Sequence, residues 1–287
     1  PADRDLLRLA ARSLLARPAD TPLHGSALAV LLRDPQERAR HLPHAVECFR
    51  QGTSRLPAEA LVEVLPTLED ARDVDRVFEA LRARADGEVL RALAALTGPA
   101  LARRAGDLVR ERLAGHPEDA PHAAVFVDLR LEQGRAARGV VQPLVTGLLR
   151  GPAEVRAALA GVLAAPGGED SRELRGELAD VLLTAEEDPG VLDAVLGALA
   201  HGAGRCPEER TRQLLRRTGR LLLRTPGGPA LFERRTVELA RTEPPFGELL
   251  ARWLAEDTAQ AAALLGPGTR RMVAGRARRT VETPAGP

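Results

Sequence analysis

Four residue types are missing from this 287-residue chain, which contains no lysine, asparagine, isoleucine or tyrosine. AT-rich codons encode all four, so their joint absence indicates a GC-rich genome, which we expect to be bacterial. All 41 basic residues are therefore arginine. Because lysine is absent, a run of arginines is a weaker sign of phosphate or carboxylate recognition here than in a chain that uses both residues.

Aromatic side chains are scarce. Five phenylalanines and one tryptophan, Trp253, make up 2% of the chain. Aromatic rings stack on nucleic-acid bases and anchor many small ligands, so this composition disfavours both kinds of site. We expect no small-molecule substrate and no cofactor.

Cysteines and long apolar runs are also lacking. The two cysteines, Cys48 and Cys206, are too few for a disulfide framework. No stretch approaches the roughly 18 uninterrupted apolar residues of a membrane-spanning helix. The first twenty residues carry charges throughout and have no apolar signal-peptide core. These absences predict a cytoplasmic protein without a membrane span.

The charges nearly cancel over the whole chain but not within its parts. A hydrophobic content of 44% and a charged content of 28% are typical of a globular protein, and the net charge is only +1. Residues 1–200 carry 25 arginines and 31 acidic residues, whereas residues 201–287 carry 16 and 9. The chain is therefore acidic at the front and basic behind, and the basic third is the part that could attract an acidic surface.

Apolar residues recur at the i, i+3, i+4, i+7 spacing of amphipathic helices over almost the whole chain, as in Val155–Leu163 and Val191–Leu199. No convincing alternation of β-branched residues predicts a strand. Prolines open many of these segments, at intervals of 18 to 23 or 35 to 37 residues. One helix of about four turns and a loop fills about 18 residues. These prolines are Pro99, Pro117, Pro152, Pro189, Pro207, Pro226, Pro244 and Pro267.

This pattern predicts an all-α protein, an α-solenoid of stacked antiparallel helical hairpins. Roughly sixteen helices, in seven to eight hairpins, would account for the chain. A hairpin of this kind cannot bury its apolar face alone, so neighbours must stack into one elongated core. No linker interrupts the pattern, and we expect a single continuous solenoid over residues 1–280 followed by a flexible tail at 281–287.

Several segments share a turn, an acidic residue, a valine or leucine and an Ala/Leu-rich helix. The clearest is Gly151–Gly167, GPAEVRAALAGVLAAPG; Asp86–Gly98 and Asp188–Gly202 are similar, and Asp34–Phe49 is a looser copy. These segments resemble HEAT repeats of the HEAT/armadillo type. The resemblance implies a solenoid whose concave face holds a partner protein or another domain. The spacing of 35–37 residues is shorter than the ~40–47 usual for such repeats.

Two other repeat families have partial support. Tetratricopeptide repeats have a similar period of about 34 residues but pack through tryptophan, tyrosine and phenylalanine, which this chain lacks. The string Thr21-Pro22-Leu23-His24 matches the opening of an ankyrin repeat. It occurs once, with no copy near 33 residues further on, so we interpret Pro22 as an ordinary helix start.

The strongest local feature is the helix expected after Pro207. Leucines and Thr218 occupy one side at 100° per residue, and arginines occupy the other. Such a face could bind an acidic protein, a phosphate backbone or an anionic membrane, or it could be a solvated outer surface. We call this set the arginine face: Arg212, Arg216, Arg217, Arg220 and Arg224. A second basic cluster, which could complement a helix dipole at the end of the stack, comprises Arg270, Arg271, Arg276, Arg278 and Arg279.

One expected helix places four potential metal ligands on a single face. Glu37, His41, His44 and Cys48 have the spacing i, i+4, i+7, i+11. Ligands on consecutive turns of one helix cannot surround an ion, however, and Pro43 is expected to interrupt the helix. We therefore predict no metal site and expect Cys48 to be a small buried hydrophobic residue.

Catalytic signals are weak. No serine lies in a G-x-S-x-G elbow. Cys206 precedes a helix start, where the dipole could lower its pKa, but no histidine is fixed beside it. The pair Gly227-Gly228 is read as a turn because no phosphate-loop lysine follows. Acidic pairs such as Glu69-Asp70 and the run Glu186–Asp188 stand at helix boundaries, where nothing suggests burial.

These observations predict a non-catalytic protein-interaction scaffold or a regulatory or sensor module, with a protein or an adjoining domain as partner. Trp253 lies among leucines on one helical face and is expected in the core, or as an exposed anchor for the partner. The alternative is nucleic-acid binding through the basic C-terminal third. A HEAT-like DNA glycosylase is a weaker alternative because it needs a catalytic carboxylate framed by aromatic residues. No residue favours a lyase-like HEAT protein acting on a cofactor.

Overall fold

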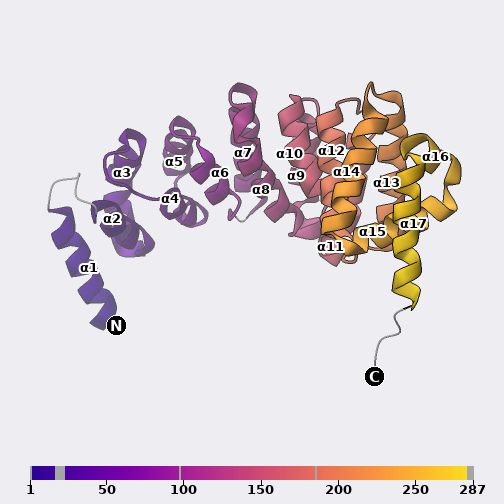
Figure 1. Ribbon diagram of the computed structural model, residues 1–287. Helices are drawn as coiled ribbons and strands as arrows, with labels where there is room; N and C mark the ends of the chain where they lie inside the picture. Colours follow the sequence, from indigo (N-terminus) through magenta and orange to yellow (C-terminus); the bar gives the residue numbers. More distant parts are fainter. Residues whose placement is uncertain (1, 17–22, 97, 185, 283–287) are drawn as a thin grey trace. The chain divides into compact units, whose positions relative to one another are not determined.

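The computed structural model describes residues 2–16, 23–96, 98–184 and 186–282, without the side chains of residues 2, 4, 135 and 276–282. Within these ranges the chain forms 17 α-helices and three 3-10 helices, and it contains no strand (Figure 1). The all-α prediction is confirmed, and the helix number is close to the sixteen expected. None of the described helices combines the length and apolar character needed to cross a bilayer.

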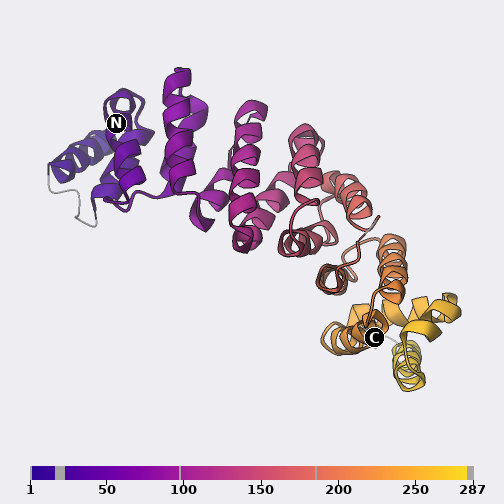
Figure 2. The ribbon, with the colours of Figure 1, turned by 90° about the horizontal axis from the view of Figure 1, so that it is seen from above.

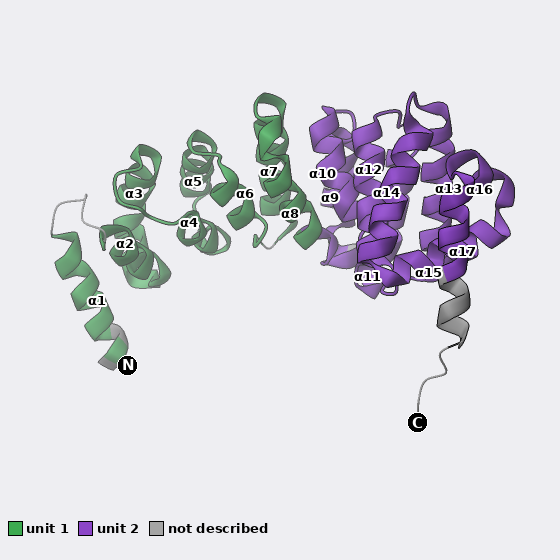
Figure 3. Cartoon of the chain, viewed as in Figure 1, with its two compact units in different colours: residues 1–129 green, residues 130–287 purple. Residues whose placement is uncertain are grey.

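The chain divides into two compact units, residues 1–129 and 130–287, and the division falls within α8 (Figure 3). The single continuous solenoid over residues 1–280 stays a prediction. Of the predicted tail at 281–287, residues 283–287 lie outside the described part of the chain.

The helices of unit 1 are α1 (Ala2–Leu15), α2 (His24–Arg33), α3 (Pro35–Gln51), α4 (Ala58–Val64), α5 (Ala71–Ala83), α6 (Gly87–Leu93), α7 (Pro99–Gly115) and α8 (Ala120–Leu131). Their packing is sequential. Helix α2 contacts α1, α3 and α4, helix α3 contacts α5, and α4 contacts α6. Leucines and alanines fill the interior between them, including Leu28, Leu61 and Leu90, which are fully buried.

The helices of unit 2 are α9 (Arg138–Leu148), α10 (Ala153–Leu163), α11 (Glu169–Leu182), α12 (Pro189–Gly202), α13 (Glu208–Arg224), α14 (Gly228–Thr242), α15 (Pro244–Glu256), α16 (Thr258–Leu264) and α17 (Pro267–Glu282). Helix α12 contacts α10, α13 and α14, and α15 contacts α14 and α17. Within each unit, helices contact helices that are one or two places away along the chain, such as α2 with α4 and α12 with α14 (Figures 1 and 2).

Trp253 lies in the core of unit 2. Its side chain has no exposed surface, and its ring lies 5.7 Å from that of Phe232, centroid to centroid. Burying a side chain of this size stabilises the fold by about 2–3 kcal/mol. The core prediction for Trp253 is confirmed, and a role as an exposed anchor is wrong.

Prolines and aspartates mark the helix starts, as the spacing predicts. Pro152 and Pro207 directly precede α10 and α13, and α12, α15 and α17 each begin with a proline. Helix α14 begins later than Pro226, at Gly228, because Gly227 adopts φ 74° and makes the turn. Pro22 lies outside the described residues, and α2 begins at His24.

Helix α3 differs from the expectation at Pro43. The proline does not interrupt the helix, which runs from Pro35 to Gln51. A proline removes one backbone hydrogen bond. The buried flanking residues Leu42 and Ala45 hold the helix against its neighbours in spite of that loss. The residues of this face therefore stay on one continuous helix.

Candidate interaction surface

Helix α13 separates its two sides as the sequence predicts. Leu214, Leu215 and Leu222 are buried in unit 2. Thr218 is buried with them, and its hydroxyl donates to the Leu214 carbonyl at 2.8 Å. The opposite side carries the arginine face, in which Arg212, Arg216 and Arg217 are half-buried whereas Arg220 and Arg224 are exposed.

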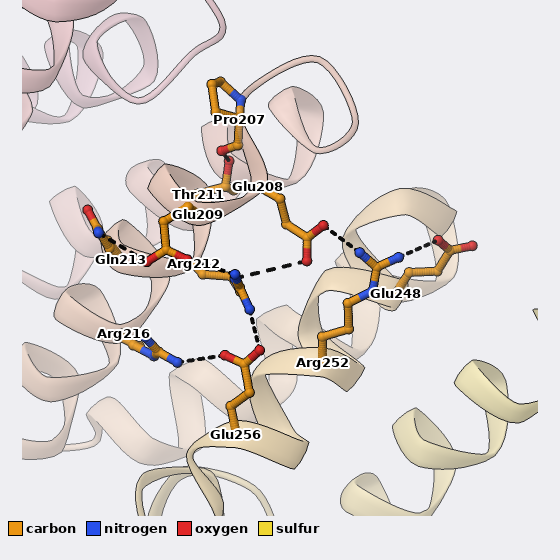
Figure 4. Close-up of polar contacts among 10 residues, drawn as sticks. All are labelled: Pro207, Glu208, Glu209, Thr211, Arg212, Gln213, Arg216, Glu248, Arg252 and Glu256. Carbon is orange, nitrogen blue, oxygen red and sulfur yellow. Dashed lines mark hydrogen bonds and ion pairs between the residues drawn. The ribbon is translucent and has the colours of Figure 1, made fainter.

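Two of these arginines bind one carboxylate of α15. Arg212 and Arg216 both donate to Glu256, the latter at 2.7 Å (Figure 4). Arg212 also donates to Glu209 at 2.7 Å, and Arg216 lies 3.9 Å from Asp257. In the other direction, Arg252 of α15 donates to α13. The contacts of Glu256 and Arg252 join α13 to α15, and each contributes about 0–1 kcal/mol at the surface.

A third arginine binds the helix on the other side. Arg217 donates to the carboxylate of Asp180 on α11 and to the hydroxyl of Thr184, two residues after α11 ends. Arg220 and Arg224, in contrast, have no hydrogen-bond or ion-pair partner among the described residues. Three of the five arginines therefore form contacts within unit 2, and two are exposed without a partner among the described residues.

An open pocket of about 750 Å³ lies between α11 and α13. Its walls differ in charge, since α11 supplies carboxylates and α13 supplies guanidinium groups. The α11 wall consists of Glu173, Gly176, Glu177 and Asp180, and the α13 wall of Arg210, Gln213, Leu214, Arg216, Arg217 and Arg220. We call this cavity the α11–α13 pocket.

Arg210 of α13 packs against the backbone of α11. Its guanidinium donates to the backbone carbonyl of Arg172. A Cβ at Gly176 would lie 2.9 Å from Arg210 Nη1, so the glycine makes room for this contact. Burial lowers the pKa of Arg210, but an arginine keeps its charge at neutral pH.

The surroundings of Cys206 do not favour an activated nucleophile. The residue is half-buried just before α13. Burial raises the pKa of its thiol, and the nearby positive charges of Arg210, Arg172 and Arg175 only partly offset that effect. At neutral pH the thiol is therefore protonated and weakly nucleophilic.

The acidic residues at helix boundaries divide into two kinds. Asp70 and Asp188 cap α5 and α12, accepting hydrogen bonds from backbone N–H groups of the first turn. Glu186, which we expected to be exposed, is buried. Arg156 donates two hydrogen bonds to it, at 2.8 and 3.2 Å, and the backbone N–H of Asp188 donates a third. Glu186 is thus a structural group whose burial is compensated.

A buried arginine in α11 was not apparent from the sequence. Arg175 is 1% exposed and donates to the carbonyl of Val162 and to Glu132, each at 2.6 Å. Although burial acts to raise it, the pKa of Glu132 is held below its ordinary value by the hydrogen bond and charge of Arg175. The residues that surround Arg175 lie on separate segments, so no local spacing signals the burial.

The four potential ligands on α3 do not act together. Glu37 binds Arg12 of α1, and His41 Nε2 lies 3.2 Å from Glu37 Oε2. His44 and Cys48 lie further along α3 and approach His24, the first residue of α2. The expectation that Cys48 is buried is confirmed, but its neighbours are imidazole nitrogens as well as apolar groups.

The second basic cluster is only partly described. Arg270 is half-buried, and Arg271 is exposed and donates to the Pro267 carbonyl at 3.4 Å. The side chains of Arg276, Arg278 and Arg279 lie outside the described residues.

Comparison of the chain with protein-family models, with curated proteins and with solved structures finds no match.

Proposed function

We propose that this chain is a non-catalytic protein-interaction module built from stacked HEAT-like hairpins, and that the α11–α13 pocket with Arg220 and Arg224 binds an acidic segment of a protein partner. The observation that carries the proposal is the division of the arginine face into paired and unpaired residues. Sequential helix packing within each unit supports the HEAT-like architecture.

Charge favours a protein partner over a nucleic acid. A phosphate backbone repeats its negative charge at short, regular intervals and is best matched by a continuous row of cations. Here Glu256 and Asp180 already neutralise Arg212, Arg216 and Arg217. The opposite wall of the pocket also presents carboxylates. Two unpaired arginines beside a mixed-charge pocket suit a few carboxylates on a peptide.

The pocket also offers an apolar contact. Leu214 of α13 lines it among the charged side chains. A partner segment that combines carboxylates with apolar side chains would use both kinds of contact, as protein interfaces commonly do.

The test uses a fluorescent peptide of alternating glutamate and leucine residues and a DNA duplex as probes, with binding followed by anisotropy. The double variant Arg220→Glu/Arg224→Glu should lose at least about tenfold in peptide affinity, since each reversed charge replaces attraction with repulsion. The matched control is Arg234→Glu/Arg241→Glu, which makes the same charge change at two exposed arginines of α14. That variant should bind the peptide as the wild type does.

Two results would contradict the proposal. One is equal loss of peptide binding in both double variants, which would show only a response to net charge. The other is tighter binding of the duplex than of the peptide, with an affinity that falls steeply with salt. That second result would favour the nucleic-acid alternative.

A further inference from the structure

Three metal-ligating side chains meet in unit 1, away from the arginine face. They are His24 at the start of α2 and His44 and Cys48 on α3, and we call them the His–Cys cluster. One ligand atom from each lies within 4.8 Å of the others. His24 and Cys48 are 2% and 5% exposed, whereas His44 is exposed. The cluster is therefore buried on two sides and open on the third.

Two of the three separations between ligand atoms match a tetrahedral zinc site. His24 Nε2 and His44 Nε2 are 3.3 Å apart, and His44 Nε2 and Cys48 Sγ are 3.6 Å apart. Zinc bonds of about 2.0–2.1 Å to nitrogen and about 2.3 Å to sulfur, at tetrahedral angles, place two nitrogens about 3.3–3.4 Å apart and a nitrogen and sulfur about 3.5–3.6 Å apart. Both separations agree with the observed ones.

The polar atoms of the cluster have few other partners. The Nδ1 atom of His24 is buried and has no hydrogen-bond partner among the described residues. The two Nε2 atoms face each other, so only one can carry a proton at a time. A metal ion would take the lone pair of one nitrogen from each imidazole.

The local fold holds the three side chains in place. His44 and Cys48 are one turn apart on α3, so the helix itself puts them on the same face. Gly25 brings His24 to them, because a Cβ at this position would lie 2.2 Å from the Ser54 carbonyl oxygen. The start of α2 is therefore seated directly against the loop that follows α3. A side chain at Gly25 would clash with the backbone of Ser54 and Arg55 and displace the start of α2.

We propose that His24 Nε2, His44 Nε2 and Cys48 Sγ bind a zinc ion, with the fourth coordination position open on the exposed side of His44. Binding converts the Cys48 thiol to a thiolate and releases its proton to solvent. Three protein ligands from two helices and one open position allow a water molecule, or a side chain of a partner, to complete the tetrahedron. The donor set of two imidazoles and one thiolate suits zinc among the common divalent ions.

The first experiment titrates the metal-free protein with Zn²⁺ by calorimetry and with Co²⁺ by absorption. The wild type should bind one ion, and the cobalt form should show a thiolate-to-cobalt charge-transfer band. His44→Ala should weaken Zn²⁺ binding by at least about 100-fold, since loss of even an outer-shell partner costs 10–100-fold. His41→Ala is the matched control, because His41 lies on the same helix and binds Glu37 instead.

The second experiment separates a metal site from a structural role. Zn²⁺ should raise the melting temperature of the wild type and of His41→Ala but not that of His44→Ala. His44 is exposed, so its removal should leave the helical content unchanged. Cys48→Ser should abolish the cobalt band, and Cys206→Ser should keep it. Unchanged Zn²⁺ affinity in folded His44→Ala, or a wild-type cobalt complex without thiolate absorption, would overturn the proposal.

Discussion

Helices α11 and α13 face each other across one pocket, and their arginines occupy three different environments. Arg175 of α11 is buried and donates to Glu132 and a backbone carbonyl. Arg212 and Arg216 of α13 are half-buried and share Glu256. Arg220 is exposed on the same helix. Arginine thus occurs in the core, between packed helices and on the exposed surface. The groups that the neighbouring segments supply determine which environment each arginine has.

Replacing the buried arginine should have the largest effect. Arg175→Met leaves the Val162 carbonyl and Glu132 without their donor, so the free energy of unfolding should fall by about 2–3 kcal/mol. Urea denaturation followed by circular dichroism measures this change. Arg172→Met is the control. Arg172 is half-buried on the same helix, and its side chain donates no hydrogen bond among the described residues. If both variants lose the same free energy of unfolding, the buried contacts of Arg175 do not stabilise the fold more than a half-buried arginine does.

Acid should weaken the ion pair between Arg175 and Glu132. The pKa of Glu132 is lower in the folded protein than its ordinary value, so its contribution is present above that ordinary value and is lost as the pH falls through the folded-state pKa. Between about pH 6 and about pH 3, Glu132→Gln should lose less stability than the wild type. Glu169→Gln, at an exposed position of α11, should follow the wild type. Urea denaturation at each pH provides the comparison.

Removing the ion pairs between α13 and α15 should lower stability less than Arg175→Met does, and it should change peptide binding. Glu256→Gln removes the carboxylate that Arg212 and Arg216 share, and stability should fall by about 1 kcal/mol. The two arginines then keep fewer acidic neighbours, such as Glu209 and Asp257, so the glutamate–leucine peptide should bind more tightly, as measured by anisotropy. Unchanged peptide affinity would contradict the inference that pairing with Glu256 prevents Arg212 and Arg216 from binding the peptide.

The smallest stability change is expected at the free surface. Arg220→Glu/Arg224→Glu should alter the free energy of unfolding by no more than about 0.5 kcal/mol, because neither residue has a partner to lose among the described residues. Thermal melts compare it with Arg234→Glu/Arg241→Glu. A markedly lower melting temperature in the first variant alone would mean that these arginines also support the fold.

Local features of the fold were predictable from the sequence. Helical periodicity, proline starts and the apolar side of α13 depend on residues within one helix, and they are found where expected. The continuation of α3 through Pro43 was not predictable, because tertiary contacts of Leu42 and Ala45 outweigh the lost hydrogen bond. Helix propensity depends on the segment itself, whereas packing depends on the other helices that contact it.

The candidate sites depend on residues far apart in the chain, which spacing alone does not bring together. Arg212 and Glu256 are 44 residues apart, and His24 and His44 are 20 apart. In the sequence, His24 was notable only as the last residue of a string that matches the opening of an ankyrin repeat. Because every basic residue is arginine, residue type also does not indicate which of them are buried, paired or exposed. The signal that could have linked His24 to α3 is Gly25, which tolerates no side chain.

The burial of Trp253 beside Phe232 has a practical consequence. The chain has no tyrosine and no other tryptophan, so its intrinsic fluorescence comes almost entirely from one indole in unit 2. A denaturant scan read by emission wavelength follows that unit alone, whereas far-ultraviolet ellipticity averages over all the helices. Two midpoints that coincide would indicate that both halves melt cooperatively; two that separate would give each half its own transition, without any engineered label.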